Sequence, residues 1–180
     1  MSNLDRNTQI GYRGFTLLEL LVAVTVASLL VTLGVPGFRA LTMNSRLIAN
    51  TNEFVTSINM ARSAAVRYQR NAIVCLSSDF DAAVPSCDAG TDWSIGWIVW
   101  VDKDRDAATD ADEILFVHEP ITGSATLAST TTNQFTYDPR GFAIIGGDDL
   151  TLCDGRTGET GRVVRVNNIG RTSVAEAPCS

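Results

Sequence analysis

The chain has 180 residues, of which 45% are apolar and 19% charged, and its formal net charge is −6. This length leaves room for one globular unit besides a membrane segment. The acidic balance excludes nucleic-acid binding except through a local basic patch. The sequence holds one histidine, His118, and no nucleophile-elbow, zinc-protease or phosphate-loop motif, so we expect no enzymatic activity.

The first predicted element is an apolar run from Phe15 to Val35 that contains a single charged residue, Glu19. A helix of about 20 residues crosses the hydrocarbon core of a bilayer, so the run predicts a transmembrane helix segment over 15–35. A carboxylate in such a helix costs about 2.5–3.5 kcal/mol at mid-membrane and indicates a positively charged partner. A cleaved secretory signal would have a shorter apolar core, and a plain anchor would leave Glu19 unexplained.

Residues 14–19, Gly-Phe-Thr-Leu-Leu-Glu, resemble the cleavage and methylation signature of type IV prepilins and type II secretion pseudopilins. The resemblance implies that residues 1–14 are a leader peptide and that prepilin peptidase cuts after Gly14. It also implies that the new amino terminus, Phe15, is methylated and pairs with Glu19 during filament assembly. A charged terminus and a carboxylate, each costly alone in lipid, would neutralise each other.

After the apolar run, Pro36 and Gly37 are expected to interrupt and kink the helix. Helical spacing then resumes and predicts an amphipathic helix continuation over 36–70 with one buried face. The residues expected on that face are Leu47, Thr51, Phe54, Ile58, Ala61, Ala65 and Tyr68. The residues expected to form a solvated face are Arg62, Arg67 and Arg70.

Residues 71–180 alternate short apolar runs with turn residues, which predicts a β-rich globular head. The expected strands are Ile73–Leu76, Trp97–Val101, Ile114–His118, Gln134–Tyr137, Phe142–Ile145, Leu150–Leu152 and Arg162–Val166. Turns between antiparallel strands are expected at 138–141 (Asp-Pro-Arg-Gly) and 146–149 (Gly-Gly-Asp-Asp). The predicted fold is α+β and pilin-like, a long kinked N-terminal helix packed on an antiparallel β-sheet or sandwich.

Four cysteines follow the apolar run, and no two of them have the spacing of a zinc or thioredoxin-like site. An oxidising compartment beyond the membrane would let them form two disulfides. Short loops favour Cys75–Cys87 and Cys153–Cys179, although the sequence alone leaves three pairings open.

The stretch 102–113 is the one candidate metal site. Its acidic residues fall at the first, third, fifth, ninth and twelfth places: Asp102, Asp104, Asp106, Asp110 and Glu113. This is the ligand spacing of an EF-hand calcium loop. Ala107 replaces the usual glycine, Lys103 and Arg105 offset the charge, and the flanks are predicted strands. A solvated acidic hairpin is therefore the alternative to a Ca²⁺ site, and no other cofactor is expected.

Three segments of the chain resemble the GspH/FimT group of minor pilins and pseudopilins: 61–65 (Ala-Arg-Ser-Ala-Ala), 93–99 around Trp97, and the turn 138–141. Some members of this group resemble DNA receptors with a C-terminal Gly-Arg-x-Arg motif. Here 170–173 reads Gly-Arg-Thr-Ser, so the second arginine is missing. The candidate DNA contacts are Arg162, Arg165 and Arg171, with Arg156 close by in the sequence.

The resemblance implies a minor type IV pilin that primes or caps pilus assembly at the tip. The alternatives are a GspH-like minor pseudopilin of a type II secretion system and a DNA-uptake minor pilin of the FimT kind. The expected location is the bacterial inner membrane, with a single membrane pass and a periplasmic head. The expected partners are prepilin peptidase and other minor and major pilins or pseudopilins, with DNA not favoured.

Overall fold

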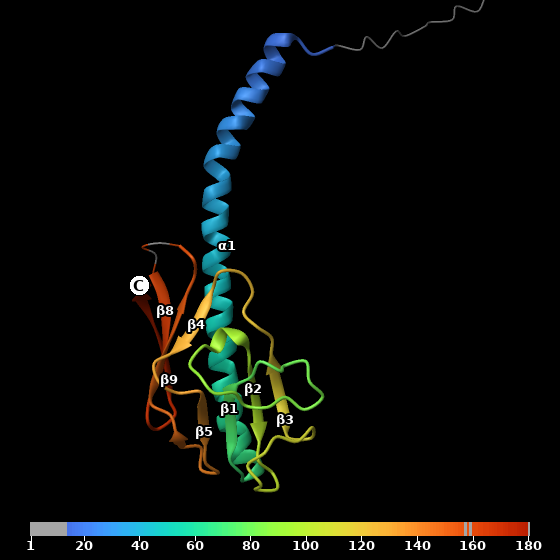
Figure 1. Cartoon of the computed structure of the whole chain (residues 1–180). Coiled ribbons are helices and arrows are strands. Elements are labelled where there is room, and N and C mark those ends of the chain that lie inside the picture. The colour runs from blue at the N-terminus through green and yellow to red at the C-terminus, as the bar shows by residue number, and fades with distance from the viewer. Residues whose placement is uncertain (1–13, 157, 159, 180) are drawn as a thin grey trace, which may run out of the picture. The chain divides into compact units, whose positions relative to one another are not determined.

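The computed structural model describes residues 14–156, 158 and 160–179. These residues fall into two compact units, here called the N-terminal unit (14–42) and the C-terminal unit (43–179). One helix, α1 (Leu17–Tyr68), begins in the first unit and ends in the second (Figure 1). The predicted leader peptide, residues 1–14, lies outside the described residues except for Gly14.

In the N-terminal unit, α1 is apolar and exposed, and it is long and apolar enough to cross a membrane. Its few hydroxyl groups bond to the helix itself. Thr25 donates to Val22 O (2.8 Å), Ser28 to Val24 O (2.7 Å) and Thr32 to Leu29 O (2.9 Å). Because these polar groups are satisfied within the helix, they do not require water, which suits a lipid environment.

The expected interruption at Pro36 and Gly37 is wrong, because α1 is continuous through both residues. Proline removes one backbone hydrogen bond from a helix interior. Ending the helix there would leave many more backbone groups without partners, which is far more costly in a membrane. One missing bond is therefore tolerated inside a long apolar helix.

In the C-terminal unit, α1 buries the predicted face from Leu47 to Ala65, and Ser57 and Ala64 are buried as well. Tyr68, expected on this face, is instead 38% exposed. It is the last residue of α1, and its ring lies within 6 Å of the Arg67 guanidinium (5.4 Å) and the Lys103 ammonium (5.9 Å). The ring therefore lies at the surface beside two cations.

Two antiparallel sheets complete the C-terminal unit. The five-stranded sheet has the order β3-β2-β1-β5-β6 and is made of β1 (Ala72–Leu76), β2 (Trp97–Val101), β3 (Ile114–His118), β5 (Gln134–Tyr137) and β6 (Ala143–Ile145). The four-stranded sheet has the order β4-β7-β8-β9 and is made of β4 (Thr126–Ser129), β7 (Asp148–Cys153), β8 (Thr160–Val166) and β9 (Thr172–Pro178). A short 3-10 helix, η1 (Trp93–Ile95), precedes β2.

The core lies where α1 meets the inner faces of both sheets. Phe54 of α1 packs edge-on against Trp93, Trp97 and Phe135, with ring centroids 5.2, 5.5 and 6.2 Å apart. Trp97 also donates a buried hydrogen bond from Nε1 to Ser57 Oγ at 2.9 Å. The serine on the buried face of α1 therefore satisfies an indole that would otherwise be buried without a partner.

The strand predictions hold best inside the five-stranded sheet, where β2, β3 and β5 have the predicted bounds. The turn at 138–141 joins β5 to β6, with a hydrogen bond from Gly141 N to Asp138 O at 2.8 Å. The predicted turn at 146–149 is only partly correct, because Asp148 and Asp149 already belong to β7. Strands β4 and β9 were not predicted, and both lie at the edges of the four-stranded sheet.

Candidate functional site

The segment that resembles a prepilin junction lies at the start of α1. Thr16 accepts a hydrogen bond at Oγ1 from Glu19 N (3.2 Å), and its carbonyl accepts one from Leu20 N (3.1 Å). Thr16 therefore caps the helix, and Glu19 lies in the first turn, where the helix dipole favours a negative charge. The helix begins just after the predicted cleavage bond.

The predicted cleavage bond, Gly14–Phe15, is exposed in the described part of the chain. Phe15 is 81% exposed, and a Cβ atom built at Gly14 would have no neighbour within 4 Å. Contacts with the described residues therefore do not require glycine at position 14. Its presence is better explained by a partner that must approach the backbone closely.

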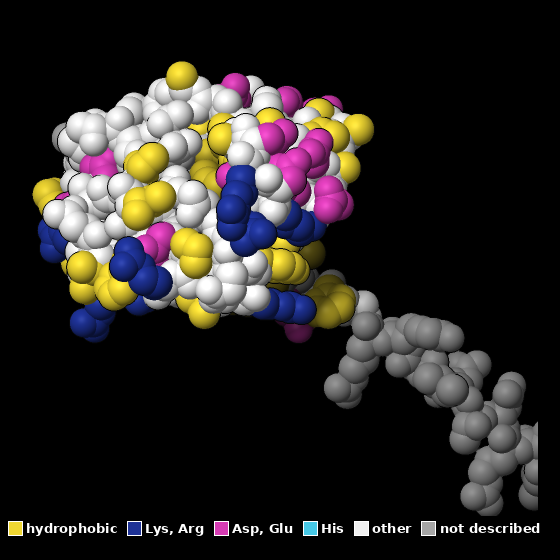
Figure 2. All heavy atoms as spheres, turned by 90° about the horizontal axis from the view of Figure 1, so that it is seen from below, with side chains coloured by type: hydrophobic (Ala, Val, Ile, Leu, Met, Phe, Trp, Pro, Cys, Tyr) yellow, Lys and Arg dark blue, Asp and Glu magenta, His cyan; other side chains and the backbone are white. Residues whose placement is uncertain are grey.

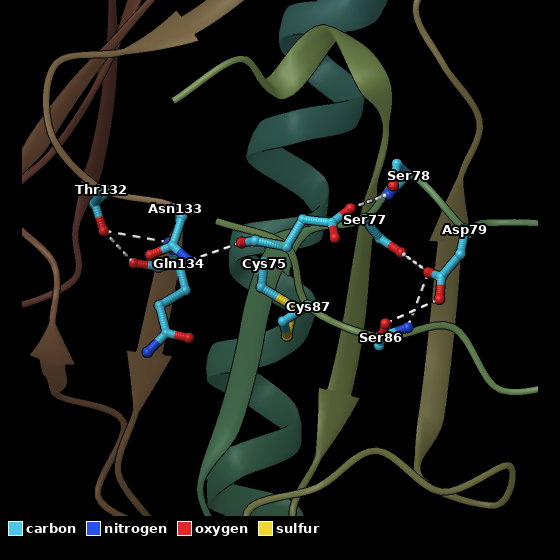
Figure 3. The surroundings of a disulfide bond; sticks show 10 residues. Cys75, Ser77, Ser78, Asp79, Ser86, Cys87, Thr132, Asn133 and Gln134 are labelled. Atoms are coloured by element: carbon cyan, nitrogen blue, oxygen red, sulfur yellow. Dashed lines mark hydrogen bonds between the residues drawn. A yellow bond between two sulfur atoms is a disulfide. The ribbon is translucent and has the colours of Figure 1, made fainter. Parts of the chain in front are cut away.

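The first disulfide joins Cys75 in β1 to Cys87, with 5.5 Å between their Cα atoms (Figure 3). Cys75 belongs to the cluster of Ile73, Ile98 and Trp100, on the face of the sheet that α1 does not cover. Asp79 holds the enclosed loop by accepting from Ser77 Oγ (2.8 Å), Ser86 N (2.9 Å) and Ser86 Oγ (2.9 Å). Burial opposes the charged form, but these hydrogen bonds outweigh it and lower the pKa of Asp79.

The second disulfide joins Cys153, the last residue of β7, to Cys179, which follows β9, with 5.8 Å between Cα atoms. Strand β8 lies between these two strands in the sheet, so the bridge passes against it. A Cβ atom on Gly161 of β8 would lie 2.5 Å from Cys179 Sγ and 2.9 Å from Cys153 Sγ. Glycine at 161 thus makes room for the bridge. Both pairings that loop length favours are present.

Next to this bridge, Asp154 forms an ion pair with Arg156 at 2.6 Å. The hydrogen bond from Arg156 is the main reason that the pKa of Asp154 lies below its usual value. Arg156 also donates from Nη2 to Asn44 Oδ1 of α1 at 2.7 Å. This arginine therefore ties the turn after β7 to the helix and serves the structure of the C-terminal unit.

The predicted metal residues lie in the loop between β2 and β3. The carboxylates of Asp102, Asp104 and Asp106 each place an oxygen within 4.8 Å of the others. Asp110 is exposed, whereas Glu113 is 2% exposed. The structure thus brings the carboxylates of Asp102, Asp104 and Asp106 together and buries that of Glu113, the last residue of the predicted calcium loop.

The candidate DNA contacts are not gathered into one patch. Arg162 lines a cavity of about 270 Å³ with Leu47 of α1 and Glu176 of β9. Arg165 is three residues further along β8, so strand alternation places it on the opposite face of the sheet, where Asp149 pairs with it at 3.1 Å. Arg171 lines a separate cavity of about 480 Å³ with Arg165. The acidic partner and the division between faces give no continuous track for phosphates.

Gly170, the first residue of the shortened Gly-Arg-x-Arg motif, has a structural explanation. Its φ is +78°, and a Cβ atom there would lie 2.3 Å from the Tyr137 ring. Tyr137 donates a hydrogen bond from its hydroxyl to Gly170 O at 3.1 Å. Burial raises the pKa of Tyr137 to about 12, with Arg62 opposing the shift, so the hydroxyl remains a donor.

His118 is the last residue of β3 and contacts both the sheet and α1. Its ring stacks on Trp97 with centroids 3.6 Å apart, and its Nε2 lies 2.8 Å from Glu53 Oε2 of α1. This contact, like the Ser57–Trp97 bond, links α1 to the five-stranded sheet. Sequence reasoning missed both links, because each joins residues at least 40 positions apart.

An apolar N-terminal helix that continues into a unit of two antiparallel sheets, preceded by an open glycine–phenylalanine junction, defines a pilin or pseudopilin. The family model for type II transport protein GspH matches residues 50–170, and that for the prokaryotic N-terminal methylation motif matches residues 11–35. The chain therefore belongs to the GspH family. This family consists of structural pilins and pseudopilins, which assemble with other pilins and are processed by prepilin peptidase.

Two crystal structures of the type IV minor pilin FimU from Pseudomonas aeruginosa share the fold. In space group P21 the identity is 19% and the TM-score 0.56, covering 74% of this chain and 91% of FimU. In space group P65 the identity is 18% and the TM-score 0.52, covering 73% and 91%. No curated protein matches the chain by sequence. At this identity the likeness to FimU concerns the fold alone.

Proposed function

We propose that this protein is a minor pilin of a type IV pilus that acts in the priming complex at the pilus tip. Prepilin peptidase cuts between Gly14 and Phe15 and methylates Phe15, and the protein then joins other minor and major pilins. The exposed Gly14–Phe15 bond directly before a capped, apolar helix supports processing and assembly, and the fold shared with the type IV minor pilin FimU favours the pilus.

The two disulfides support a periplasmic location for the C-terminal unit. Both link residues that follow the apolar part of α1, and no described cysteine is free. Disulfides persist in the bacterial periplasm and are rare in the cytosol. The proposed arrangement is therefore a single pass through the inner membrane, with the leader on the cytosolic side.

Glu19 supplies the charge that drives assembly in this proposal. Cleavage creates a positively charged amino terminus at Phe15, one helical turn before Glu19. Glu19 lies in the first turn of the apolar helix and Phe15 two residues before the helix begins, so inside a bilayer neither charge would be solvated by water. A subunit that docks so that an ammonium group meets a carboxylate neutralises both charges, which favours entry into the filament over remaining free in the bilayer.

A minor pseudopilin of a type II secretion system is the second candidate. The family model that covers most of the C-terminal unit carries the description of a type II transport protein. The proposed cleavage, the membrane insertion and the role of Glu19 are the same in both machines. The two candidates differ only in which filament the subunit enters.

Deletion of the gene separates the two candidates. We expect the deletion strain to lose nearly all surface pili while its type II secretion is unchanged, and the wild-type gene to restore the pili. Pilus number by electron microscopy and secreted protein by gel measure the two outcomes. Normal piliation with lost secretion would reject the pilus assignment in favour of the pseudopilin.

Replacing Glu19 by valine is expected to leave cleavage intact but prevent assembly. An uncompensated buried charge costs about 3–5 kcal/mol, which corresponds to a fall of at least ~100-fold in incorporation. Immunoblots of sheared filaments and of membranes measure incorporation and cleavage separately. Thr25→Val is the matched control, because it removes a polar group of the same helix whose hydroxyl bonds only to that helix. Equal incorporation of the Glu19 and Thr25 variants would remove the proposed role of Glu19.

A further inference from the structure

The loop between β2 and β3 concentrates negative charge in a small volume. The oxygens of Asp102, Asp104 and Asp106 lie within 4.8 Å of one another, which is close enough for a single ion to contact all three. On the face drawn in Figure 2, acidic side chains gather in one group next to a group of basic ones. Exposed acidic groups often occur without an ion, so this cluster alone does not make a site.

Glu113 is the independent observation that points to a cation. The residue is 2% exposed, and its Oε1 accepts a hydrogen bond from Lys103 N at 2.5 Å. Because Lys103 lies between Asp102 and Asp104, this hydrogen bond holds the buried carboxylate against the backbone of the acidic loop, next to the three carboxylates that lie within 4.8 Å of one another. Its Oε2 is buried and has no hydrogen-bond partner among the described residues. A buried carboxylate with an unpaired oxygen is strongly unfavourable unless a positive charge balances it.

Two cationic side chains that contact the loop, those of Lys103 and Arg70, have other partners. Lys103 Nζ donates to the carbonyl of Asp112 and forms an ion pair with its carboxylate at 3.1 Å. Arg70 of α1 donates from Nε to Lys103 O at 2.9 Å. Both side chains are therefore engaged elsewhere, and among the described residues no ion pair joins Glu113 to a basic side chain.

The backbone holds the cluster closed. Asp102 Oδ1 accepts from Arg105 N (2.8 Å), Asp104 Oδ1 from Asp106 N (3.1 Å), and Asp106 Oδ1 from Ala108 N (2.8 Å). In each carboxylate the second oxygen is not used in these bonds and can bind a metal. The chain turns through positive φ at Ala107 (60°), at the place where calcium loops carry glycine.

We propose that the β2–β3 loop binds one Ca²⁺ ion through the carboxylates of Asp102, Asp104, Asp106 and Glu113. Asp110, at the ninth position, contributes directly or through a water molecule. An all-oxygen site with several carboxylates suits Ca²⁺, whereas Mg²⁺ requires a tighter octahedron at about 2.0–2.1 Å. The affinity is expected to be that of extracellular modules, about 10⁻⁴–10⁻³ M, because Lys103 and Arg105 reduce the charge and Ala107 strains the turn.

Bound Ca²⁺ would fix the loop to the end of α1. Asp102 N donates to Asn71 O at 3.0 Å, and Arg70 contacts the carbonyl of the next residue. Ordering the loop therefore also orders the junction of α1 with β2. We expect calcium to stabilise the C-terminal unit and thereby to make the supply of competent subunits depend on calcium.

The test uses the full chain in a nonionic detergent, with calorimetric titration of CaCl₂ and thermal unfolding in EDTA or 10 mM CaCl₂. We expect one site and a rise of about 5 °C in the unfolding temperature for the wild type in calcium. Asp104→Asn should weaken binding at least tenfold. Asp81→Asn, an exposed acidic residue outside the loop, is the control and should bind as the wild type does.

Glu113→Gln distinguishes a metal ligand from a merely structural residue. If Glu113 is a ligand, the variant should lose the calcium response, yet in EDTA it should unfold at the wild-type temperature or above, because a buried charge is removed. If Glu113 only accepts the Lys103 hydrogen bond, glutamine keeps that acceptor, and the variant should respond to calcium as the wild type does. That outcome overturns the proposal, as does an absent calcium response in the wild type or an equal response to MgCl₂.

Discussion

Gly14→Ala is expected to leave the protein as an uncut precursor in the membrane. A Cβ atom at position 14 meets nothing within 4 Å, so the change does not disturb this chain. Any defect must therefore arise where the peptidase approaches the backbone. Misplacing a scissile bond by about 1 Å can slow a reaction ~100-fold, and we expect a fall of this order in the rate of cleavage. Intact-mass measurement of the membrane fraction distinguishes precursor from methylated mature protein.

Gly34→Ala is the matched control for this experiment. Gly34 lies in the same apolar helix, and a Cβ atom there also meets nothing within 4 Å. Alanine in a helix is favourable by about 1 kcal/mol relative to glycine, so cleavage and membrane insertion should be unchanged. Normal cleavage of the Gly14 variant, or retention of Met1 in assembled wild-type protein, would refute the prepilin assignment.

Strands β1 and β2 of the five-stranded sheet were predictable because buried strands have a mostly apolar composition. All five residues of β1 and of β2 are buried, and both strands read as continuous apolar runs. Strand β9 was not predictable in the same way. It contains Thr172, Ser173 and Glu176, and every residue of it is exposed or half-buried. Its conformation comes from pairing with β8 along seven residues, which is a long-range property of the sheet.

In the candidate sites too, features set by local sequence spacing were predictable, whereas features set by strand pairing were not. The spacing of Asp102, Asp104 and Asp106 is local, and the structure brings these three carboxylates together. The burial of Glu113 depends on how β3 pairs with β2, which no local pattern reveals. The arginines after residue 160 are close in sequence, but strand alternation and Asp149 separate Arg162 from Arg165. Basic residues that are close together on a strand therefore form one surface patch only if they are an even number of positions apart, because only then do they lie on the same face of the sheet.

Removing the Cys153–Cys179 bridge is expected to cause the largest loss of stability in the C-terminal unit. The bridge closes a loop with a sequence separation of 26, worth about 3.5 kcal/mol in the chain-entropy model. The Cys75–Cys87 loop, with a separation of 12, is worth about 2.8 kcal/mol on the same basis. For a domain of this size, the loss of the longer loop corresponds to a fall of ~10 °C in the unfolding temperature. Thermal unfolding of Cys153→Ala/Cys179→Ala by circular dichroism measures it.

We also expect the destabilisation caused by removing the Cys153–Cys179 bridge to be confined to particular strands. Strand β9 is an edge strand with little buried apolar surface, so backbone bonds to β8 and the terminal bridge are its main supports. Without the bridge we expect faster hydrogen exchange at the amides of β8 and β9, with β1 and β2 unchanged. The Cys75→Ala/Cys87→Ala variant is the spatial control and should leave β9 protected. If β9 stays protected in the Cys153/Cys179 variant, its pairing with β8 is sufficient alone, and the bridge does not serve to hold down the C-terminal strand.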